Sequence, residues 1–372
     1  MNSPHAGVIL VVNAGSSSLK LRVLDAHDQV VEQADLPAIA GASDLEAVRG
    51  LLARHPGIRA IGHRMVHGGP EFQTSTLITG DLLERLRAVS DLAPLHNPSA
   101  LAGLDAMIEA APGLPNVVCF DTAFHASLPA AAATYAIPRQ WTEAWGIRRY
   151  GFHGLNHSYL ARRVPELLER PSEGLRLVSC HLGAGASLAA ILDGHSIDTT
   201  MGFTPLEGLV MATRSGSLDP GILIHVQRHH GLSVDELERV LDEESGLRGL
   251  SGSSGDMRAV ERAVDEGDPL AALAFEVYVH RLAGAIAAMA ASLGGVDAIA
   301  FTGGVGEGSA RLRHAATARL AFLGVTIDEA TNERAGDEDG VLSPEGAAVP
   351  VLLVHAREDL EIAREVRRTL AP

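Results

Sequence analysis

The sequence predicts an α/β protein from two observations. Short apolar runs typical of buried strands alternate with helix-like segments along its 372 residues, as they do in α/β folds. Two predicted hairpins, over residues 8–25 and 175–193, also resemble each other, since each has an apolar strand, a tight Gly/Ser turn and a second apolar strand ending in aspartate. This echo indicates a duplicated domain with a cleft between its halves, although a Gly/Ser hairpin turn is also an ordinary local structure.

The individual elements follow from local patterns. Apolar runs predict strands at 8–13, 19–25, 58–67, 116–121, 175–181 and immediately before Gly303. Helix-like patterns occupy 81–90, 235–245 and 310–322, and the polar stretch after Asp25 is helix-like through Arg54. The stretch 301–309, FTGGVGEGS, is expected to contain a glycine-rich loop.

Composition and charge exclude several classes of function. A formal net charge of −16 argues against binding of nucleic acid or of an anionic membrane surface. The most hydrophobic long segment, 271–293, carries Glu276 and Arg281, so we expect a core helix and no membrane span. Cys119 and Cys180 lie in apolar runs, as buried thiols do in a reducing compartment. The N-terminus has no basic region that would indicate a secretory signal, and a cytoplasmic location is expected.

The turn of the first hairpin, NAGSSSLK, ends in Lys20, the only lysine of the chain. Since the sequence otherwise uses arginine, Lys20 indicates a place that needs a compact charge, although one residue can also remain by chance. The segment is not a P-loop, because it lacks the second glycine and a strand follows it. Its backbone N–H groups and hydroxyls could still face a phosphate. The alternative is a plain hairpin with an exposed lysine.

Two further glycine-rich segments each follow a predicted buried strand. They are HLGAGAS at 181–187 and FTGGVGEGS at 301–309. Glycine lets the backbone approach a ligand closely, although each segment alone could be only a tight turn. Together with the first hairpin turn they favour a phosphate or nucleotide site held mainly by main chain.

Polar residues at the ends of apolar strands indicate the chemistry. Arg64 lies among apolar residues in GHRMVHGG, where it needs either a structural acid partner or a carboxylate or phosphate ligand. Arg214 lies in a Gly/Ser/Pro-rich loop, and Asp121 follows a buried strand, a common place for a Mg²⁺ carboxylate. His153 and His157 have zinc-ligand spacing but no evident third ligand. Such a set is typical of phosphoryl transfer, in which positioning and charge neutralisation do most of the catalysis.

Nearly the whole chain resembles the acetate/propionate kinase family. The matching segments, in order, are NAGSSSLK, GHRMVHGG, APLHNP, FDTAFH, YGFHGLNH, CHLGAGAS, DTTMGFTPLEGLVMATRSGSLDP, SGDMR and FTGGVGEGS. The resemblance implies the duplicated actin/Hsp70/sugar-kinase fold, which is ribonuclease H-like, with two domains around a nucleotide cleft. It also implies reversible, direct in-line transfer of phosphate from ATP to acetate, giving acetyl phosphate and ADP with Mg²⁺ or Mn²⁺, in a homodimer.

The resemblance assigns the acid and phosphoryl groups by motif. Arg64 would bind the acetate carboxylate, Arg214 would stabilise charge on the transferring phosphoryl group, and His153 would donate a hydrogen bond to it. Asp121 would lie near the metal and phosphates. The small apolar pocket for the acid's methyl group would be formed by Val66, Leu95, Phe152 and Pro205. Such a pocket suits a one- or two-carbon tail, and one extra methylene changes discrimination by only ~1–3 kcal/mol.

The metal and nucleotide residues are implied in the same way. Asn13 and Glu358 would hold the metal, and Ser16, Ser18 and Lys20 would lie beside the phosphates. The other ATP-binding residues implied by the matching motifs are His181, Leu182, Gly183, Ala184, Gly185, Asp256, Met257, Arg258, Gly303, Gly304, Val305, Gly306 and Glu307.

The chain departs from the family pattern at several positions. Ala184 stands where the family usually has asparagine, Gly308 replaces the asparagine of GEN, and Ser217 replaces the aspartate of RSGD. The C-terminal TNEE is ARED here, which leaves Glu358 as the candidate metal-linked acid and Asp359 as an alternative. These changes affect nucleotide contacts more than acid contacts.

The predicted domains are an N-terminal acid and phosphate domain, 1–125 plus 360–372, and a C-terminal nucleotide-binding and dimerisation domain, 126–359. The expected partners are acetate or acetyl phosphate, ATP or ADP, and a second copy of the chain. Propionate and butyrate are alternative acids. A non-catalytic ATP-binding switch of the actin/Hsp70-like fold is the alternative from another class of function.

Overall fold

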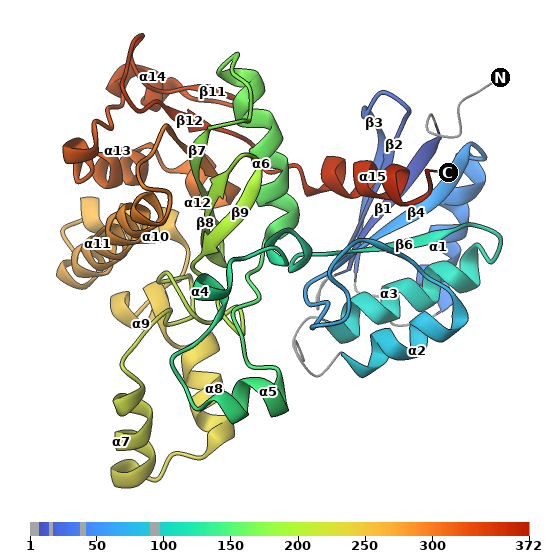
Figure 1. Cartoon of the computed structure of the whole chain (residues 1–372), viewed down its shortest axis with the longest axis horizontal. Coiled ribbons are helices and arrows are strands. Elements are labelled where there is room, and N and C mark those ends of the chain that lie inside the picture. Colours follow the sequence, from blue (N-terminus) through green and yellow to red (C-terminus); the bar gives the residue numbers. More distant parts are fainter. Residues whose placement is uncertain (1–6, 15–17, 38–41, 90–96, 372) are drawn as a thin grey trace. The chain divides into compact units, whose positions relative to one another are not determined.

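The computed structural model describes residues 7–14, 18–37, 42–89 and 97–371. The chain divides into two compact units (Figure 1). Unit 1 consists of Met1–Ala126, Phe152–Tyr159 and Arg357–Pro372, and unit 2 consists of Ser127–Gly151 and Leu160–Ala356. The short segment Phe152–Tyr159 therefore packs with unit 1, although the residues on both sides of it in the sequence belong to unit 2.

Unit 1 is built on a six-stranded mixed sheet. Its strand order is β3-β2-β1-β4-β6-β5. The strand bounds are β1 (Val8–Ala14), β2 (Ser18–Leu24), β3 (Val30–Pro37), β4 (Ile58–Met65), β5 (Thr76–Leu77) and β6 (Asn116–Phe120). The helices of this unit are α1 (Ala42–Arg54), α2 (Gly80–Ala88), α3 (Asn97–Ala110), the 3₁₀ turn η3 (Ala123–His125) and α15 (Glu358–Thr369).

Unit 2 contains a second six-stranded mixed sheet, in the order β11-β12-β10-β7-β8-β9. Its strands are β7 (Arg176–Leu182), β8 (Ala186–Leu192), β9 (His195–Thr199), β10 (Ala298–Thr302), β11 (Gly340–Val341) and β12 (Val351–Leu353). Its helices are α4 (Ala130–Ala133), α5 (Arg139–Trp145), α7 (Pro220–His230), α8 (Val234–Glu243), α9 (Gly246–Ser251), α10 (Met257–Asp265), α11 (Pro269–Ser292), α12 (Gly303–Gly308), α13 (Ala310–Ala318), η4 (Ala321–Leu323) and α14 (Glu329–Arg334). Helix α6 (Gly154–Leu167) begins in unit 1 and ends in unit 2.

The two sheets have the same topology, which confirms the predicted duplication. In unit 1, β1, β2 and β3 pair antiparallel in turn, β1 pairs parallel with β4, β4 parallel with β6, and β6 antiparallel with β5. In unit 2, β7, β8, β9, β10, β12 and β11 repeat these relations in the same order. Six strands with matching partners and directions cannot be explained by a chance similarity of one hairpin turn.

Both predicted hairpins are confirmed. Residue Asn13 of β1 pairs with Lys20 of β2, and His181 of β7 pairs with Ser187 of β8. Asn13 and His181 therefore occupy equivalent places, each one residue before the end of its strand. The Asp193–Gly194 pair turns the chain from β8 into β9 with both residues at positive φ, 53° and 78°, as two-residue hairpin turns require.

The sheet of unit 1 is buried on both faces because successive side chains of a strand point in opposite directions. Ile9 and Val11 of β1 pack toward Ile362 and Val366 of α15. The residues between them, Leu10 and Val12, belong to a separate cluster that includes side chains of α1 and α3. Helices thus cover this sheet on both faces, with α15 on one and α1 and α3 on the other (Figure 1).

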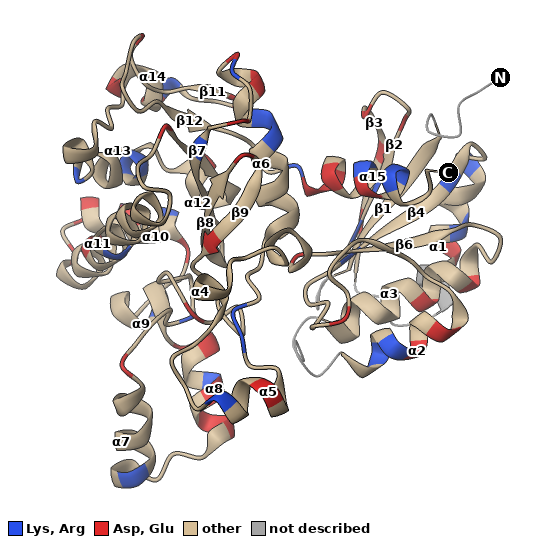
Figure 2. Cartoon of the chain, viewed as in Figure 1, with Lys and Arg blue, Asp and Glu red and all other residues tan. Residues whose placement is uncertain are grey.

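In unit 2, helix α11 packs against β7, β8 and β9. It is long and apolar enough to pass a length and hydropathy test for a membrane span. Ten of its residues are buried inside the unit, whereas Glu276 and Arg281 are exposed, and Glu276 pairs with Arg319 at 2.5 Å. This is the pattern of the predicted core helix. The charged residues lie mainly on helices, and strands β8, β10 and β12 carry none (Figure 2).

Two local predictions are wrong. Residues 30–37, expected within a helix-like stretch, form strand β3, which pairs with β2 at the sheet edge and has no buried residue. Residues 303–308, expected as a loop, form the short helix α12. Cys119 and Cys180 are both free and buried, as predicted.

Gly62 marks the closest approach of α15 to the sheet of unit 1. It lies within β4, paired with Val11 and Val117, so it does not break the strand. A Cβ atom at this position would lie 2.6 Å from the Cγ2 atoms of both Ile362 and Val366. These methyl groups are on β-branched side chains with little rotamer freedom. A glycine is therefore required for α15 to pack at this distance.

We expect Gly62→Ala to lower the free energy of unfolding by about 1–3 kcal/mol, because the added methyl overpacks a buried helix–sheet contact. Urea denaturation followed by circular dichroism measures the change. Gly80→Ala at the start of α2 is the matched control, since nothing lies within 4 Å of a Cβ at that position. Equal stabilities of the two variants would contradict the assignment.

Candidate functional site

In unit 1, parallel strand pairing brings the predicted polar residues to one edge of the sheet. Asn13 is near the end of β1, Arg64 near the end of β4, and Asp121 directly follows β6. These three strands are mutually parallel in the order β1, β4, β6. The carboxyl ends of parallel strands lie at the same edge, which is where α/β proteins bind ligands.

Arg64 and Asp121 form an ion pair at this edge. The Arg64 Nη2 atom lies 2.8 Å from Asp121 Oδ2, and its Nε donates to the same carboxylate at 3.2 Å. The Asp121 side chain is 1% exposed and that of Arg64 is 19% exposed. Arg64 was expected either to pair with a structural acid or to bind an anionic ligand. The structure shows that it pairs with Asp121, and Arg64 is also the residue expected to bind the ligand.

The charges of this pair are set by burial and by their neighbours. Burial disfavours the Arg64 guanidinium, but Asp121 and Glu358 outweigh that effect and raise the pKa of Arg64. Burial raises the pKa of Asp121, while Arg64 and the backbone N–H of Leu155 act to lower it. The fork contact with Arg64 thus opposes the protonation of Asp121 that burial favours.

The segment that follows Gly151 adds two predicted residues to this edge. The Phe152 ring is 1% exposed and packs against the His67 ring, with centroids 5.4 Å apart. His153 has a φ of 55°, in the left-handed region that residues other than glycine seldom adopt. The Gly154 N–H donates to the Asp121 carbonyl at 2.9 Å, and a Cβ on Gly154 would overlap that carbonyl. Sequence-distant residues thus meet around Asp121.

The remaining predicted residues of unit 1 are less enclosed. Val66 is half-buried in the turn after β4, Ser18 is half-buried at the start of β2, and Lys20 is exposed. Lys20 lies between Asn13 on one neighbouring strand and Asp35 on the other. Ser16 and Leu95 lie outside the described residues.

The contacts of Arg357 distinguish the two candidate metal-linked acids, Glu358 and Asp359. Both oxygens of the Asp359 carboxylate accept hydrogen bonds from Arg357, at 2.9 and 3.0 Å. Glu358 instead acts electrostatically on Arg64 and Asp121. The structure therefore favours Glu358 as the acid of the site, because the carboxylate of Asp359 already has a cation.

The donor groups at this edge suit a hard divalent cation. Among the described residues no group of three or more His, Cys, Asp or Glu side chains could hold a metal by itself. Mg²⁺ typically uses one or two carboxylates together with substrate phosphates and water, and the metal-binding atoms that Asn13, Asp121 and Glu358 offer are oxygens. His157 is buried beside His125, with ring centroids 5.6 Å apart, and the described residues give this pair no further zinc ligand.

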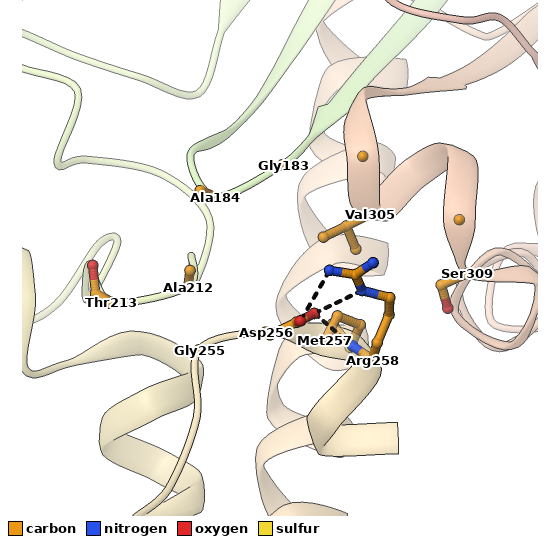
Figure 3. A pocket seen from close by; sticks show the side chains of 12 residues that line it. Gly183, Ala184, Ala212, Thr213, Gly255, Asp256, Met257, Arg258, Val305 and Ser309 are labelled. Atoms are coloured by element: carbon orange, nitrogen blue, oxygen red, sulfur yellow. Dashed lines mark hydrogen bonds and ion pairs between the residues drawn. The ribbon is translucent and has the colours of Figure 1, made fainter. Parts of the chain in front are cut away.

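Unit 2 contains a cavity of about 500 Å³ (Figure 3). Seven of the predicted nucleotide residues line it, from the turn between β7 and β8, the start of α10, and α12: Gly183, Ala184, Asp256, Met257, Arg258, Gly304 and Val305. The predicted glycine-rich segments of this unit, far apart in sequence, therefore converge on one cavity. Its size is in the range of small-molecule sites.

The polar side of this cavity is formed by Asp256 and Arg258. Asp256 is the N-cap of α10 and accepts the Arg258 N–H at 3.0 Å. The Arg258 guanidinium folds back over the same carboxylate, at 3.2 and 3.1 Å (Figure 3). Hydrogen bonding to Arg258 lowers the pKa of Asp256.

Helix α12 has four glycines in six residues and is held from both ends. The Glu307 carboxylate accepts the N–H groups of Gly303 at 2.8 Å and Ala356 at 2.9 Å. Arg313, which is 1% exposed, donates to the carbonyls of Gly306 and Glu307 at 2.8 and 2.7 Å. Burial lowers the pKa of Arg313 to about 10. Glu307 thus shapes the cavity wall instead of lining the cavity.

Other predicted residues support the cavity from behind. A Cβ on Gly303 would lie 2.8 Å from the Leu182 carbonyl, and one on Gly306 would lie 3.6 Å from the Leu182 Cβ. His181 is 9% exposed, and Gly185 accepts the Gly183 N–H at 2.9 Å within the turn. The close approach to Leu182 explains the glycine at position 303, which also has a φ of 78°.

Sequence reasoning missed four residues that line the cavity: Ala212, Thr213, Gly255 and Ser309. Ala212 reaches it because its N–H donates to the Ala184 carbonyl at 3.1 Å, and nothing in its sequence context indicates this. Ser309 could have been found, since a serine before a helix is an N-cap signal; its hydroxyl accepts the Leu312 N–H at 3.0 Å.

Arg214 and Pro205, also in unit 2, contact each other. The Arg214 Nη1 atom donates to the Pro205 carbonyl at 3.4 Å. Its Nε lies 3.5 Å from the Asp242 carboxylate on α8. Burial lowers the pKa of Arg214 and Asp242 partly offsets this, while burial raises the pKa of Asp242. Sequence reasoning missed Asp242.

The duplicated sheets and the cavity at the end of β7 and β10 define a protein of the duplicated actin-like, nucleotide-binding fold. The model of the Acetokinase family matches residues 37–364. The chain belongs to that family.

Known proteins resemble this chain along most of its length. An acetate kinase of Synechococcus sp. (strain JA-2-3B'a(2-13)) is 53% identical over 321 residues, which are 86% of this chain and 79% of the relative. A crystal structure of Porphyromonas gingivalis acetate kinase superposes with a TM-score of 0.91 at 34% identity, covering 98% of this chain and 100% of that one. A propionate kinase from Francisella tularensis subsp. tularensis SCHU S4 has a TM-score of 0.89 at 37% identity, covering 96% and 98%.

We expect Asp121→Asn to lower the free energy of unfolding by about 3 kcal/mol, because it leaves the Arg64 charge without its buried partner. The double variant Arg64→Met with Asp121→Leu should regain more than half of that loss, since no unpaired charge remains. Urea denaturation of the wild type and both variants checks this. A double variant as unstable as Asp121→Asn would show that the pair is not coupled.

His63, beside Arg64 in β4, gives the protein an acid-sensitive group. Its Nε2–H donates to Asn116 Oδ1 at 2.8 Å, and burial lowers its pKa from 6.5 to about 4. Between these values the unfolded chain binds more protons than the folded one, so stability falls as the pH drops. We expect His63→Gln to reduce the pH dependence of the free energy of unfolding by up to about 1.4 kcal/mol per pH unit. Unfolding free energies of the wild type and the variant between pH 7 and 4 measure this change. The same pH dependence in both proteins would contradict the prediction.

Proposed function

We propose that this protein catalyses reversible phosphoryl transfer from ATP to acetate, giving acetyl phosphate and ADP. The observation that carries the proposal is membership of the Acetokinase family over residues 37–364. The geometry agrees with it, since unit 1 supplies a strand-end arginine beside the buried Asp121, and unit 2 supplies a cavity lined by glycine-rich segments.

The proposed reaction needs anion binding and charge neutralisation. A carboxylate oxygen of acetate attacks the γ-phosphorus of ATP in line, a new O–P bond forms, and the bond to the ADP oxygen breaks. No proton is transferred, so positioning and charge neutralisation account for most of the rate. Arg64 is proposed to hold the acetate carboxylate. Arg214 and His153 are proposed to stabilise the phosphoryl oxygens as charge moves between them.

The nucleotide is proposed to occupy the cavity of unit 2. Its glycine-rich walls allow close approach of the backbone to phosphates and base, and Asp256 and Arg258 supply polar groups. The proposed domain roles follow, with most of the acid contacts in unit 1 and nucleotide binding in unit 2. Ala184 and Gly308 offer no side-chain hydrogen bonds to the donor, which makes the identity of the phosphoryl donor a part of the test.

A Mg²⁺ or Mn²⁺ ion is proposed to accompany ATP. Asn13, Asp121 and Glu358 would hold it through oxygen atoms, together with phosphate oxygens. When bound, the ion would neutralise charge on the phosphates. Lys20, on the strand next to Asn13, is proposed to act as an additional compact charge near the phosphates.

Propionate is the second candidate substrate. A propionate kinase is among the structures that superpose on this chain, at 37% identity. A half-buried Val66 and a buried Phe152 are proposed to bound the acid's alkyl group together with Pro205. A hydrophobic wall of this kind distinguishes acids one methylene apart by only about 10–200-fold.

The protein is further proposed to act as a cytoplasmic homodimer. The support for a dimer is a set of exposed apolar side chains on α5, α7 and α8: Trp141, Trp145, Ile222, Ile224 and Val234. Helices α7 and α8 have no buried residues, and apolar surface left uncovered in this way often marks an interface.

Multi-angle light scattering of the full chain should give twice the mass of one chain. Ile222→Glu with Ile224→Glu should give the single mass, because two charges would be buried in the interface. Phe322→Glu is the control, since Phe322 is 74% exposed on a different element. A monomeric wild type would refute the proposed dimer.

Hydroxylamine trapping of acyl phosphate tests the reaction directly. Purified protein with acetate, ATP and Mg²⁺ should accumulate acetyl phosphate, and propionate should react more slowly. Arg64→Ala and Arg214→Ala should each lower kcat by about 10²–10³-fold, as loss of a transition-state charge contact does. The same assay with pyrophosphate in place of ATP tests the identity of the phosphoryl donor.

The control for these variants is Arg49→Ala, which removes an exposed arginine of α1 that pairs with Glu109 at 3.4 Å. It should retain wild-type turnover. Absence of acyl phosphate from acetate, propionate and butyrate with every donor would refute the proposed function. Binding of ATP without such turnover would favour the nucleotide-binding switch.

A further inference from the structure

Residues 200–208, here called the Pro205 segment, connect β9 to the loop that carries Arg214. The segment has no regular secondary structure. Two side chains from outside it, Tyr135 and Arg149, hold it in place, and both contact Glu207 within the segment. All of these residues lie in unit 2.

Arg149 fixes the start of the Pro205 segment. Its Nη1 atom donates to the carbonyls of Thr200 and Met201, each at 3.0 Å. Its Nη2 atom donates to Glu207 Oε1 at 2.7 Å. One guanidinium therefore joins the first residues of the segment to one of the last, and a planar fork suits such a task better than a single ammonium group.

Tyr135 fixes the middle of the segment. Its hydroxyl donates to the second Glu207 oxygen and accepts the Phe203 N–H at 2.9 Å. Burial and the neighbouring Glu207 carboxylate raise the pKa of Tyr135, so the proton stays on the hydroxyl. The Arg149 guanidinium lies over the Tyr135 ring, 5.4 Å from its centroid. Both Glu207 oxygens are thus engaged.

Two glycines show how closely the segment is packed around this group. A Cβ on Gly202 would overlap the Glu207 carboxylate and the Tyr135 hydroxyl. Gly208 has a φ of 111°, and it exchanges hydrogen bonds with Ser217, at 3.1 and 2.9 Å. The segment is therefore constrained at its start, its middle and its end.

The constrained segment presents the Pro205 carbonyl to Arg214. That carbonyl accepts from Arg214 Nη1 at 3.4 Å, while Asp242 lies at 3.5 Å from Arg214 Nε. A shift of the Pro205 segment would change both the wall formed by Pro205 and a group that orients the Arg214 guanidinium. Displacements of about 1 Å at such a group can change rates by about 10²-fold.

We propose that Glu207, held by Arg149 and Tyr135, is a positioning residue that fixes Pro205 for recognition of the acid and Arg214 for contact with the phosphoryl group. It does not touch the substrate, and it acts through the backbone of residues 200–208. This inference rests on the proposed function, because it assigns the structural basis of acid recognition to that same reaction.

The test compares Glu207→Gln and Tyr135→Phe with the wild type. Each keeps the size of the side chain and removes one link of the network. Both should raise the KM for acetate about tenfold and shift the acetate-to-propionate ratio of kcat/KM at least about threefold, with the KM for ATP within about twofold of wild type. A ratio does not depend on how much of the sample is folded, so general loss of structure cannot produce the shift.

Asp297→Asn is the matched control. It weakens another partly buried arginine–carboxylate pair of unit 2, in which Arg176 Nη2 lies 2.7 Å from Asp297 Oδ1, and it should leave the KM for acetate and the acid ratio unchanged. If Glu207→Gln does not fold, the result for Tyr135→Phe alone tests the inference. Wild-type KM and acid ratio in the folded variants would overturn the inference and leave the proposed function standing. A wild-type protein inactive on every acid would overturn both.

Discussion

Parallel pairing of the central strands is the constraint on which both halves of this molecule depend. In each unit three parallel strands end at one edge of a mixed sheet, and hairpin partners extend the sheet on one side. Residues that follow these strands must meet there, however far apart they lie in the chain. In unit 1 the edge collects Asn13, Arg64 and Asp121, and in unit 2 it collects the glycine-rich walls of a cavity. The same backbone geometry thus produces an acid-and-cation cluster in one copy and a nucleotide-sized cavity in the other.

Much of this fold could be predicted from the sequence, because apolar strand runs and Gly/Ser turns are strong local signals. The two hairpins and the core helix α11 depend on such signals alone. Strand β3 was missed because it is an edge strand with no buried residue, in which the polar Glu32, Gln33 and Asp35 interrupt the apolar run. Helix α12 was missed because its glycines disfavour a helix. Its conformation depends instead on Glu307 and Arg313, which hold its two ends through tertiary hydrogen bonds.

The candidate site was predictable in its residue types but not in its pairings. The pattern around Arg64 indicated either an acid partner or an anionic ligand, and no local signal selects Asp121, which lies 57 positions away. The choice between Glu358 and Asp359 needed the contact with Arg357. Asp242 and the residues that contact Glu207 belong to no recognisable motif, since they act on backbone groups and on the orientation of Arg214. Residues that position others are therefore the part of a site that motifs describe least well.

The packing of α15 on β4 has a consequence for the order in which this protein is made. The strands of unit 1 precede unit 2 in the chain, yet one face of their sheet is covered by residues 358–369, which follow unit 2. Domains generally fold as units and in order of synthesis, but here the sheet of unit 1 keeps an apolar face uncovered until the residues of unit 2 have been synthesised. Unit 2, whose main segment lies wholly between these parts, can bury its own core before then. The sheet of unit 1 is therefore completed only after the chain of unit 2 has been made.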